Sequence, residues 1–232
     1  MNDRAESITK ITAKTLPFLM NAFDKRCREC FLKRDQFLDH VIELETAQLD
    51  RQLGDARQSN KARRYVSDSL QRLGPLRTVN WAVRKSTAHA LKEVQRRTNL
   101  CRDAFFNRLL LLLLLRRKHI EVLGLQTEEF DQDAVGSGPM ELIGWSVADP
   151  LAQLHLAAQE CDCPEVHGAL YRMDMSPLDF EFGTAPKGKI TPQTVMSHRL
   201  SVALSCFIDD AFVPGTEEHD APSKFTLEEL FA

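Results

Sequence analysis

The sequence predicts a mainly helical fold built around a two-stranded antiparallel ribbon, followed by a small α+β domain. Three observations predict it. One short segment alternates between apolar and polar residues, a strand-helix-helix pattern occurs twice, and the two halves of the chain carry opposite net charge. The 232 residues are enough for one large domain or two ordinary ones.

The alternating segment is VNWAVRK, residues 79–85. Val79, Trp81 and Val83 alternate with small or polar residues, so a strand here has one apolar face and one hydrogen-bonding face. A single short strand is not stable alone and needs a partner. The residues that follow predict a helix over 87–98 and a second helix from about residue 101.

A shift of 68 residues finds the partner strand, because residues 21–42 align without a gap on residues 89–110. The same shift places residues 11–16 on residues 79–84, with Pro17 in the first turn of the next helix, where a missing N–H is harmless. A further helix is expected over 61–73, between the two copies. The repeat rests on matched periodicity and on six identical pairs, Ala22/Ala90, Arg28/Arg96, Leu32/Leu100, Arg34/Arg102, Asp35/Asp103 and Phe37/Phe105.

This pattern resembles the ribbon-helix-helix family of DNA-binding proteins, to which the Arc and MetJ repressors belong, in a single-chain tandem form. The segments that carry the resemblance are VNWAVRKS (79–86) with the helix after it, NLCRDAFF (99–106), and their first-copy equivalents. The resemblance covers about residues 7–53, here called copy one, and 76–123, copy two, within a domain over 1–124. It implies that the two strands pair and enter the major groove of double-stranded DNA.

The resemblance also implies roles for individual residues. With a pseudo-dyad near Thr12 and Asn80, Lys10 lies beside Ala82 and Lys14 beside Thr78. Asparagine suits adenine, whereas lysine and arginine suit guanine. The residues expected to read bases are Lys10, Thr12, Lys14, Asn80 and Arg84. For each, the alternative is an ordinary exposed side chain.

The family holds DNA phosphates at the N-terminus of each second helix, where free N–H groups and the helix dipole favour an anion. In this chain the resemblance assigns that role to Lys33 and Arg34 in copy one, and to Cys101 and Arg102 in copy two. The alternative for the two arginines is an ion pair on the helix surface, with Asp35 or Asp103 as a partner.

The charge distribution supports a nucleic-acid-binding half. Residues 1–124 contain 25 Lys and Arg against 14 Asp and Glu, whereas residues 125–232 contain 5 against 19. Such asymmetry suggests that one half binds nucleic acid and that the acidic half has another role. Two domains that simply differ in surface charge are the alternative.

The acidic half is predicted to contain a linker at 125–140, an α+β domain at 141–213 and an acidic tail at 214–232. Within the domain we expect a helix near 150–159, short strands between 168 and 182, and a helix over 191–212. This half is expected to self-associate or bind an effector, to bind a protein partner, or to cover the ribbon and weaken DNA binding.

No sequence motif indicates catalysis, a cofactor or a metal site, so we do not expect an enzyme. The CxxC at 27–30 falls at core-like helix positions and is read as buried small residues. Cys161, Cys163 and His167, with His155 as a fourth ligand, offer thiols and imidazoles, but their CxC spacing differs from the CxxC of most closed zinc sites, so zinc is kept only as the alternative. The run Leu109–Leu115 is too short to span a membrane and is read as helix core. Six cysteines without a secretion signal indicate reduced thiols in a cytoplasmic protein.

The sequence therefore predicts sequence-specific binding of double-stranded DNA through a β-ribbon, with transcriptional repression as the expected use. The alternative is an accessory protein of conjugative DNA transfer or partition that recruits an enzyme. A helical protein-interaction module that does not bind DNA is a third reading.

Overall fold

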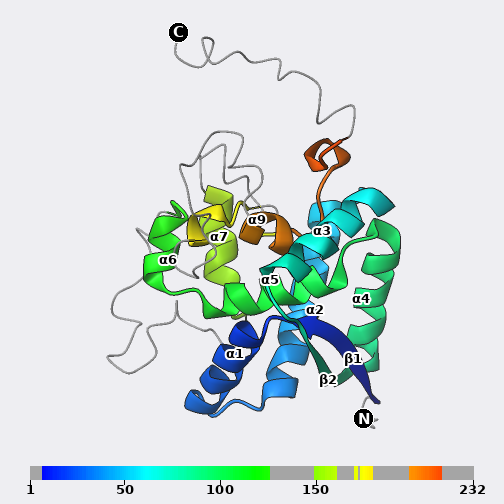
Figure 1. Cartoon of the computed structure of the whole chain (residues 1–232). Helices are drawn as coiled ribbons and strands as arrows, with labels where there is room; N and C mark the ends of the chain where they lie inside the picture. The colour runs from blue at the N-terminus through cyan, green and yellow to red at the C-terminus, as the bar shows by residue number, and fades with distance from the viewer. Residues whose placement is uncertain (1–6, 126–148, 161–169, 172, 180–198, 216–232) are drawn as a thin grey trace.

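The computed structural model describes residues 7–125, 149–160, 170–171, 173–179 and 199–215. In the described part of the basic half, a strand and two helices occur in the same order twice, with one helix between the copies (Figure 1). The elements are β1 (Ile8–Thr15), α1 (Pro17–Glu29), α2 (Arg34–Leu53), α3 (Asn60–Leu73), β2 (Arg77–Arg84), α4 (Lys85–Thr98) and α5 (Arg102–Leu114).

The two strands pair with each other as an antiparallel ribbon, with Thr12 opposite Asn80. Lys10 lies opposite Ala82 and Lys14 opposite Thr78, so the register predicted from the 68-residue shift is confirmed. The inner face of the ribbon is buried and consists of Ile11, Ala13, Trp81 and Val83. Alternation along both strands therefore separates a core face from a solvent face.

The helices of one copy cover the strand of the other. Both α5 and α4 contact β1, and α2 packs against α4 and β2. Trp81 of the ribbon stacks on Phe106 of α5, with ring centroids 4.9 Å apart. Leu109 to Leu113 are all buried, which confirms that the leucine run belongs to the core. No helix in the described residues is long and apolar enough to cross a membrane.

Equivalent residues end the first helix of each copy. Phe31 and Asn99 lie 68 residues apart and adopt φ values of 54° and 59°, in the left-handed region. Asparagine tolerates this conformation, whereas phenylalanine is strained in it. Asn99 is buried and hydrogen bonded, while Phe31 is 95% exposed. The repeat is therefore kept in the backbone even where the side chains have diverged.

The described C-terminal elements are α6 (Arg117–Val122), α7 (Ala152–Glu160), η1 (Ser176–Asp179), α9 (Arg199–Leu204) and η2 (Asp210–Phe212). They lie on the side of the molecule away from the ribbon (Figure 1). Leu154, Leu170 and Leu200 belong to the same hydrophobic core cluster as the leucines of α5. The two halves of the chain therefore share one core.

Two predictions for the acidic half were wrong in the described residues. The helix expected over 191–212 ends at Leu204, because the chain turns there and Cys206 accepts the N–H of Cys101 at 2.8 Å. Residues 170–171 and 173–179 contain no strand, and residues 176–179 form a single 3-10 turn instead. The expected helix near 150–159 is confirmed as α7. The linker, the tail and the remaining expected strand positions lie outside the described residues.

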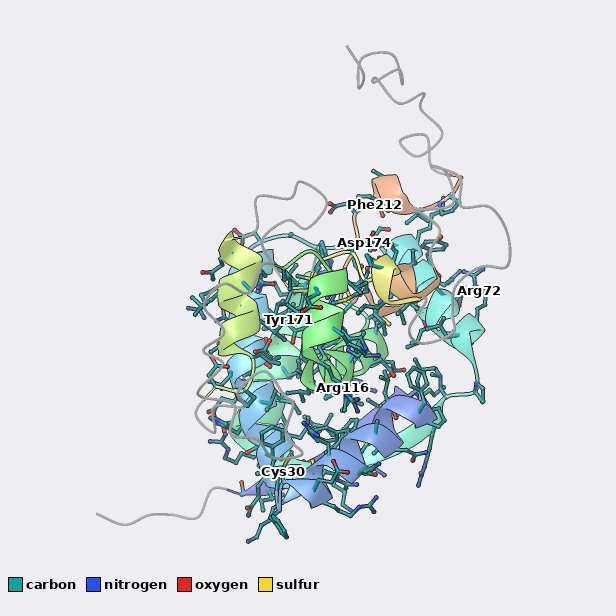
Figure 2. The ribbon with its side chains drawn as sticks, turned by 90° about the vertical axis from the view of Figure 1, so that its left-hand side faces the viewer. Cys30, Arg72, Arg116, Tyr171, Asp174 and Phe212 are labelled. Atoms are coloured by element: carbon teal, nitrogen blue, oxygen red, sulfur yellow. The ribbon has the colours of Figure 1, made fainter. Side chains whose placement is uncertain are left out.

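Buried polar side chains join the two halves. Glu45 of α2 accepts a hydrogen bond from the Tyr171 hydroxyl at 2.9 Å, and its other oxygen lies 2.9 Å from Nε2 of His155. Figure 2 shows Tyr171 near the middle of the molecule, far from the turn at Cys30. Arg108, fully buried on α5, donates to the carbonyls of Leu170 and Met173 at 2.7 and 2.6 Å.

Candidate nucleic-acid interface

The solvent face of the ribbon is exposed and basic. From β1 it presents Lys10, Thr12 and Lys14, and from β2 it presents Thr78 and Asn80. These five residues are called the outer ribbon face below. Four of the five residues expected to read bases lie on it, and strand alternation is the physical reason. The described C-terminal elements lie on another side of the molecule and leave this face open.

The centre of the outer ribbon face is a cross-strand pair. The Thr12 hydroxyl donates to Oδ1 of Asn80 at 2.6 Å. This bond fixes the Asn80 amide, so its nitrogen keeps two donors and its oxygen keeps one acceptor site. Lys10 and Lys14 lie two residues to either side on β1, about 14 Å apart along the strand. The face thus has a neutral hydrogen-bonding centre between two cations.

Arg84 occupies a different environment at the end of β2. Its Nε lies 2.6 Å from Oδ2 of Asp39, and its Nη2 lies 2.7 Å from Oε2 of Glu43, both on α2. These hydrogen bonds, to Glu43 and to Asp39, raise the pKa of the Arg84 guanidinium. In this structure Arg84 is held against α2, and reading a base would require release from at least one carboxylate.

The two edges of the ribbon are closed by side chains from the second helix of the opposite copy. Asp103 of α5 accepts the N–H of Lys14 and Asp35 of α2 accepts the N–H of Ala82, each at 3.0 Å. Because 14 and 82, like 35 and 103, differ by 68, these two bonds are equivalent in the repeat. They satisfy outward N–H groups that an edge strand would otherwise leave open for pairing.

A second equivalent pair of bonds lies two residues further along the chain, at the end of each strand. Asn107 accepts the N–H of Leu16 at 2.7 Å, and Asp39 accepts the N–H of Arg84 at 3.0 Å. Sequence reasoning did not assign a role to either residue. The sequence does contain a pattern that indicates a role for them, since Asn107 and Asp39 are polar, lie 68 residues apart and interrupt apolar helix faces. These four bonds hold the ribbon rigidly on the helices.

The residues expected to bind phosphate differ between the copies. Lys33 is exposed at the start of α2, and Arg34 is half-buried in ion pairs with Asp35 at 2.8 Å and Asp24 at 3.5 Å. The ion pair predicted as the alternative role of Arg34 is therefore present.

In copy two the N-terminus of α5 is partly covered. Arg102 is exposed, but Cys101 is 6% exposed and donates its N–H to the Cys206 carbonyl. Burial raises the pKa of the Cys101 thiol. Cys101 is thus a core residue that contacts the acidic half, and only Arg102 remains accessible for a phosphate at this end.

The described residues contain no cluster of three or more potential metal ligands. Cys27 is buried in α1 and is not part of a disulfide, and burial raises the pKa of its thiol to about 12. His155 is engaged with Glu45. Cys161, Cys163 and His167 lie outside the described residues.

Comparison with known proteins adds no assignment. The chain matches no protein-family model, no curated protein and no solved structure.

Proposed function

We propose that the protein binds double-stranded DNA by inserting the ribbon of β1 and β2 into the major groove. The observation that carries this proposal is the outer ribbon face, on which Lys10, Thr12, Lys14, Thr78 and Asn80 are all exposed while the opposite face is buried. The major groove is about 12 Å wide and accepts a two-stranded ribbon.

Each part of the outer ribbon face suits a particular task. Asn80 keeps the donors and the acceptor site that adenine recognition needs, because Thr12 occupies only one site on its oxygen. Lys10 and Lys14 suit the two acceptors of guanine, or a phosphate beside the groove. The hydrogen bonds from the strand N–H groups to Asp35 and Asp103 supply the rigidity that groove recognition requires.

The two halves of the recognised site are expected to differ. Lys10, Thr12 and Lys14 of β1 are replaced by Thr78, Asn80 and Ala82 at the equivalent positions of β2. A symmetric dimer reads two identical half-sites, whereas this chain presents two different ones. We propose use as a transcriptional regulator, by analogy with the family that the sequence resembles.

The test is binding of the full chain to a random duplex library at several salt concentrations. We expect a selected, non-palindromic sequence and a steep loss of affinity with salt. Asn80→Ala should cost about 1–3 kcal/mol and relax the preference at one position. Lys14→Ala should weaken binding and lower the salt slope by about one if it contacts phosphate.

Lys92→Ala is the matched control, because Lys92 is exposed on α4 and lies outside the ribbon. It should change neither the selected sequence nor its affinity by much. Absence of binding by the full chain at low salt would refute the proposal.

A further inference from the structure

The turn that joins α1 to α2 exposes a strained aromatic residue. Phe31 is 95% exposed and has a φ of 54°, a conformation that a bulky side chain rarely adopts. Exposure leaves a large apolar side chain in water, and the left-handed backbone adds strain. Strained residues occur most often at functional sites, where another requirement outweighs their effect on stability. Phe31 therefore has the properties of a contact residue whose partner lies outside the core.

The equivalent turn of copy two shows how such a turn is covered. Asn99 has nearly the same φ, 59°, but it is 8% exposed, against 95% for Phe31. Gln58 donates to the carbonyls of Asn99 and Cys206 at 3.0 and 3.3 Å. Oε1 of Gln58 also accepts the N–H of Ile208 at 3.0 Å. The acidic half therefore covers this turn in copy two, whereas the side chain at the same position of copy one is open to solvent.

The sequence contains a second segment of the kind that covers copy two. Residues 208–212 read IDDAF, and residues 227–231, beyond the described part of the chain, read LEELF. Both segments have an aliphatic residue, two carboxylates, a small or aliphatic residue and then phenylalanine. In the first segment Ile208 packs against the core, and Asp210 accepts a hydrogen bond from Ser59. The second segment, here called the LEELF segment, has the same chemistry and is available for the open turn.

The charge around Phe31 suits such a segment. Residues 24–35 contain five Lys and Arg against three Asp and Glu. Arg28 and Lys33, on either side of Phe31 in the sequence, are exposed, whereas Glu29 forms ion pairs within α1. The two carboxylates of the LEELF segment would meet these cations while its apolar residues meet the phenylalanine ring. Complementary charge of this kind favours one partner and fixes its orientation.

We propose that Phe31 is the docking point for the LEELF segment of a second copy of this chain. Figure 2 shows Cys30, the neighbour of Phe31, and Phe212, the last residue of the IDDAF segment, at opposite ends of the molecule. The chain continues from Phe212 toward the LEELF segment, so the contact joins one end of a molecule to the opposite end of the next. Such a heterologous contact leaves one unused surface at each end of an assembly, and association therefore increases with concentration. This inference does not depend on DNA binding.

The proposal is tested without DNA, by sedimentation equilibrium of the full chain. We expect the weight-average mass of the wild-type chain to rise between about 10 and 500 μM, since a contact of this size is weak. Phe31→Asn should keep the chain monomeric over that range. It should also raise the thermal midpoint by about 2–4 °C, because asparagine adopts the left-handed conformation more easily, as at Asn99. Leu156→Gln is the control, since it removes an exposed apolar side chain of α7 and should leave the association unchanged.

A mixture of two variants tests which surfaces meet. The tail variant carries Leu230→Asp and Phe231→Asp and should be monomeric alone, as Phe31→Asn is. Each variant keeps the surface that the other lacks, so the mixture should form complexes of two chains and nothing larger. A monomeric wild-type chain, association that survives in either variant, or a mixture without complexes would overturn the proposal. If Phe31→Asn instead weakens DNA binding and leaves association unchanged, Phe31 contacts nucleic acid and the docking site is overturned as well.

Discussion

Asn107 is the residue whose loss should most damage the attachment of the ribbon. It is fully buried on α5, and its Oδ1 accepts the N–H of Leu16 at 2.7 Å. Its Nδ2 donates to the carbonyls of Lys14 and Asp103 at 2.9 and 2.7 Å. Asn107→Ala removes all of these bonds at once, at the point where β1 passes into α1.

The cost follows from the groups left unpaired. The N–H of Leu16 and the carbonyl of Lys14 lose their side-chain partner, and each stranded group costs about 1–3 kcal/mol where water cannot replace that partner. The Asp103 carbonyl adds little, because α5 is already helical there. The free energy of unfolding should therefore fall by about 2–5 kcal/mol. For a chain of this size, about 3 kcal/mol lowers the thermal midpoint by about 6–12 °C.

Urea denaturation followed by circular dichroism measures this change in the free energy of unfolding. Two further variants serve as a control and as a comparison. Asn21→Ala removes an exposed asparagine of α1 and should change stability by no more than about 0.5 kcal/mol. Asn107→Asp keeps an acceptor for Leu16 but sets a buried carboxylate against the carbonyls of Lys14 and Asp103, without an arginine to pair it, and should destabilise the chain at least as much as Asn107→Ala. A loss below about 1 kcal/mol for Asn107→Ala would refute the reasoning that this amide secures the ribbon.

Four further predictions concern three buried residues that join the two halves. Tyr171→Phe removes the bond to Glu45 and should lower the free energy of unfolding by about 1–3 kcal/mol in urea denaturation. Burial, with the Glu45 charge beside it, raises the pKa of Tyr171 well above 10, so the contribution of the protonated Tyr171 to stability is full below pH 10 and is lost as the pH rises further. Ionisation of this phenol, followed near 295 nm, should accompany the loss of helical circular dichroism. Ionisation of Tyr171 in a fully folded chain would contradict this expectation. Burial also raises the pKa of Cys206 to about 12, so peptide mapping after iodoacetamide treatment at pH 8 should find this thiol unmodified in the folded chain and modified in urea. Arg108→Met strands the carbonyls of Leu170 and Met173 and should cost about 2–4 kcal/mol, a prediction that unchanged urea unfolding would exclude.

The ribbon was predictable because two independent patterns agreed on it. Alternation at 79–85 identified β2, and the 68-residue shift then identified β1 and its register. The ion pairs of Arg84 were not predictable in the same way. Its carboxylate partners, Asp39 and Glu43, lie more than 40 residues earlier in the chain, and a strand pattern contains no information about which helix lies beside the strand end. Local periodicity predicts which face a residue occupies but not what it meets there.

The contacts between the two halves could not be predicted from the sequence for a related reason. Arg108 precedes the leucine run, and an isolated arginine in a helix is usually an exposed residue. Here it is fully buried because α5 is covered on all sides, and backbone carbonyls of the acidic half accept its N–H groups. Those carbonyls belong to turns without a periodic sequence pattern, so their position follows only from the assembled core.

The presence of both strand-helix-helix units in one chain allows them to differ. In a symmetric dimer, a substitution that suits one side appears on the other as well. Within a single chain, α5 can be buried from Ala104 to Leu113, while its equivalent α2 lines an open groove. The pair of Asn107 and Asp39 shows the same freedom on a smaller scale. Both accept a backbone N–H at the end of a strand, but only the carboxylate also holds an arginine. The unequal copies therefore give the proposed reader two different half-sites, which a homodimer of either copy would not provide.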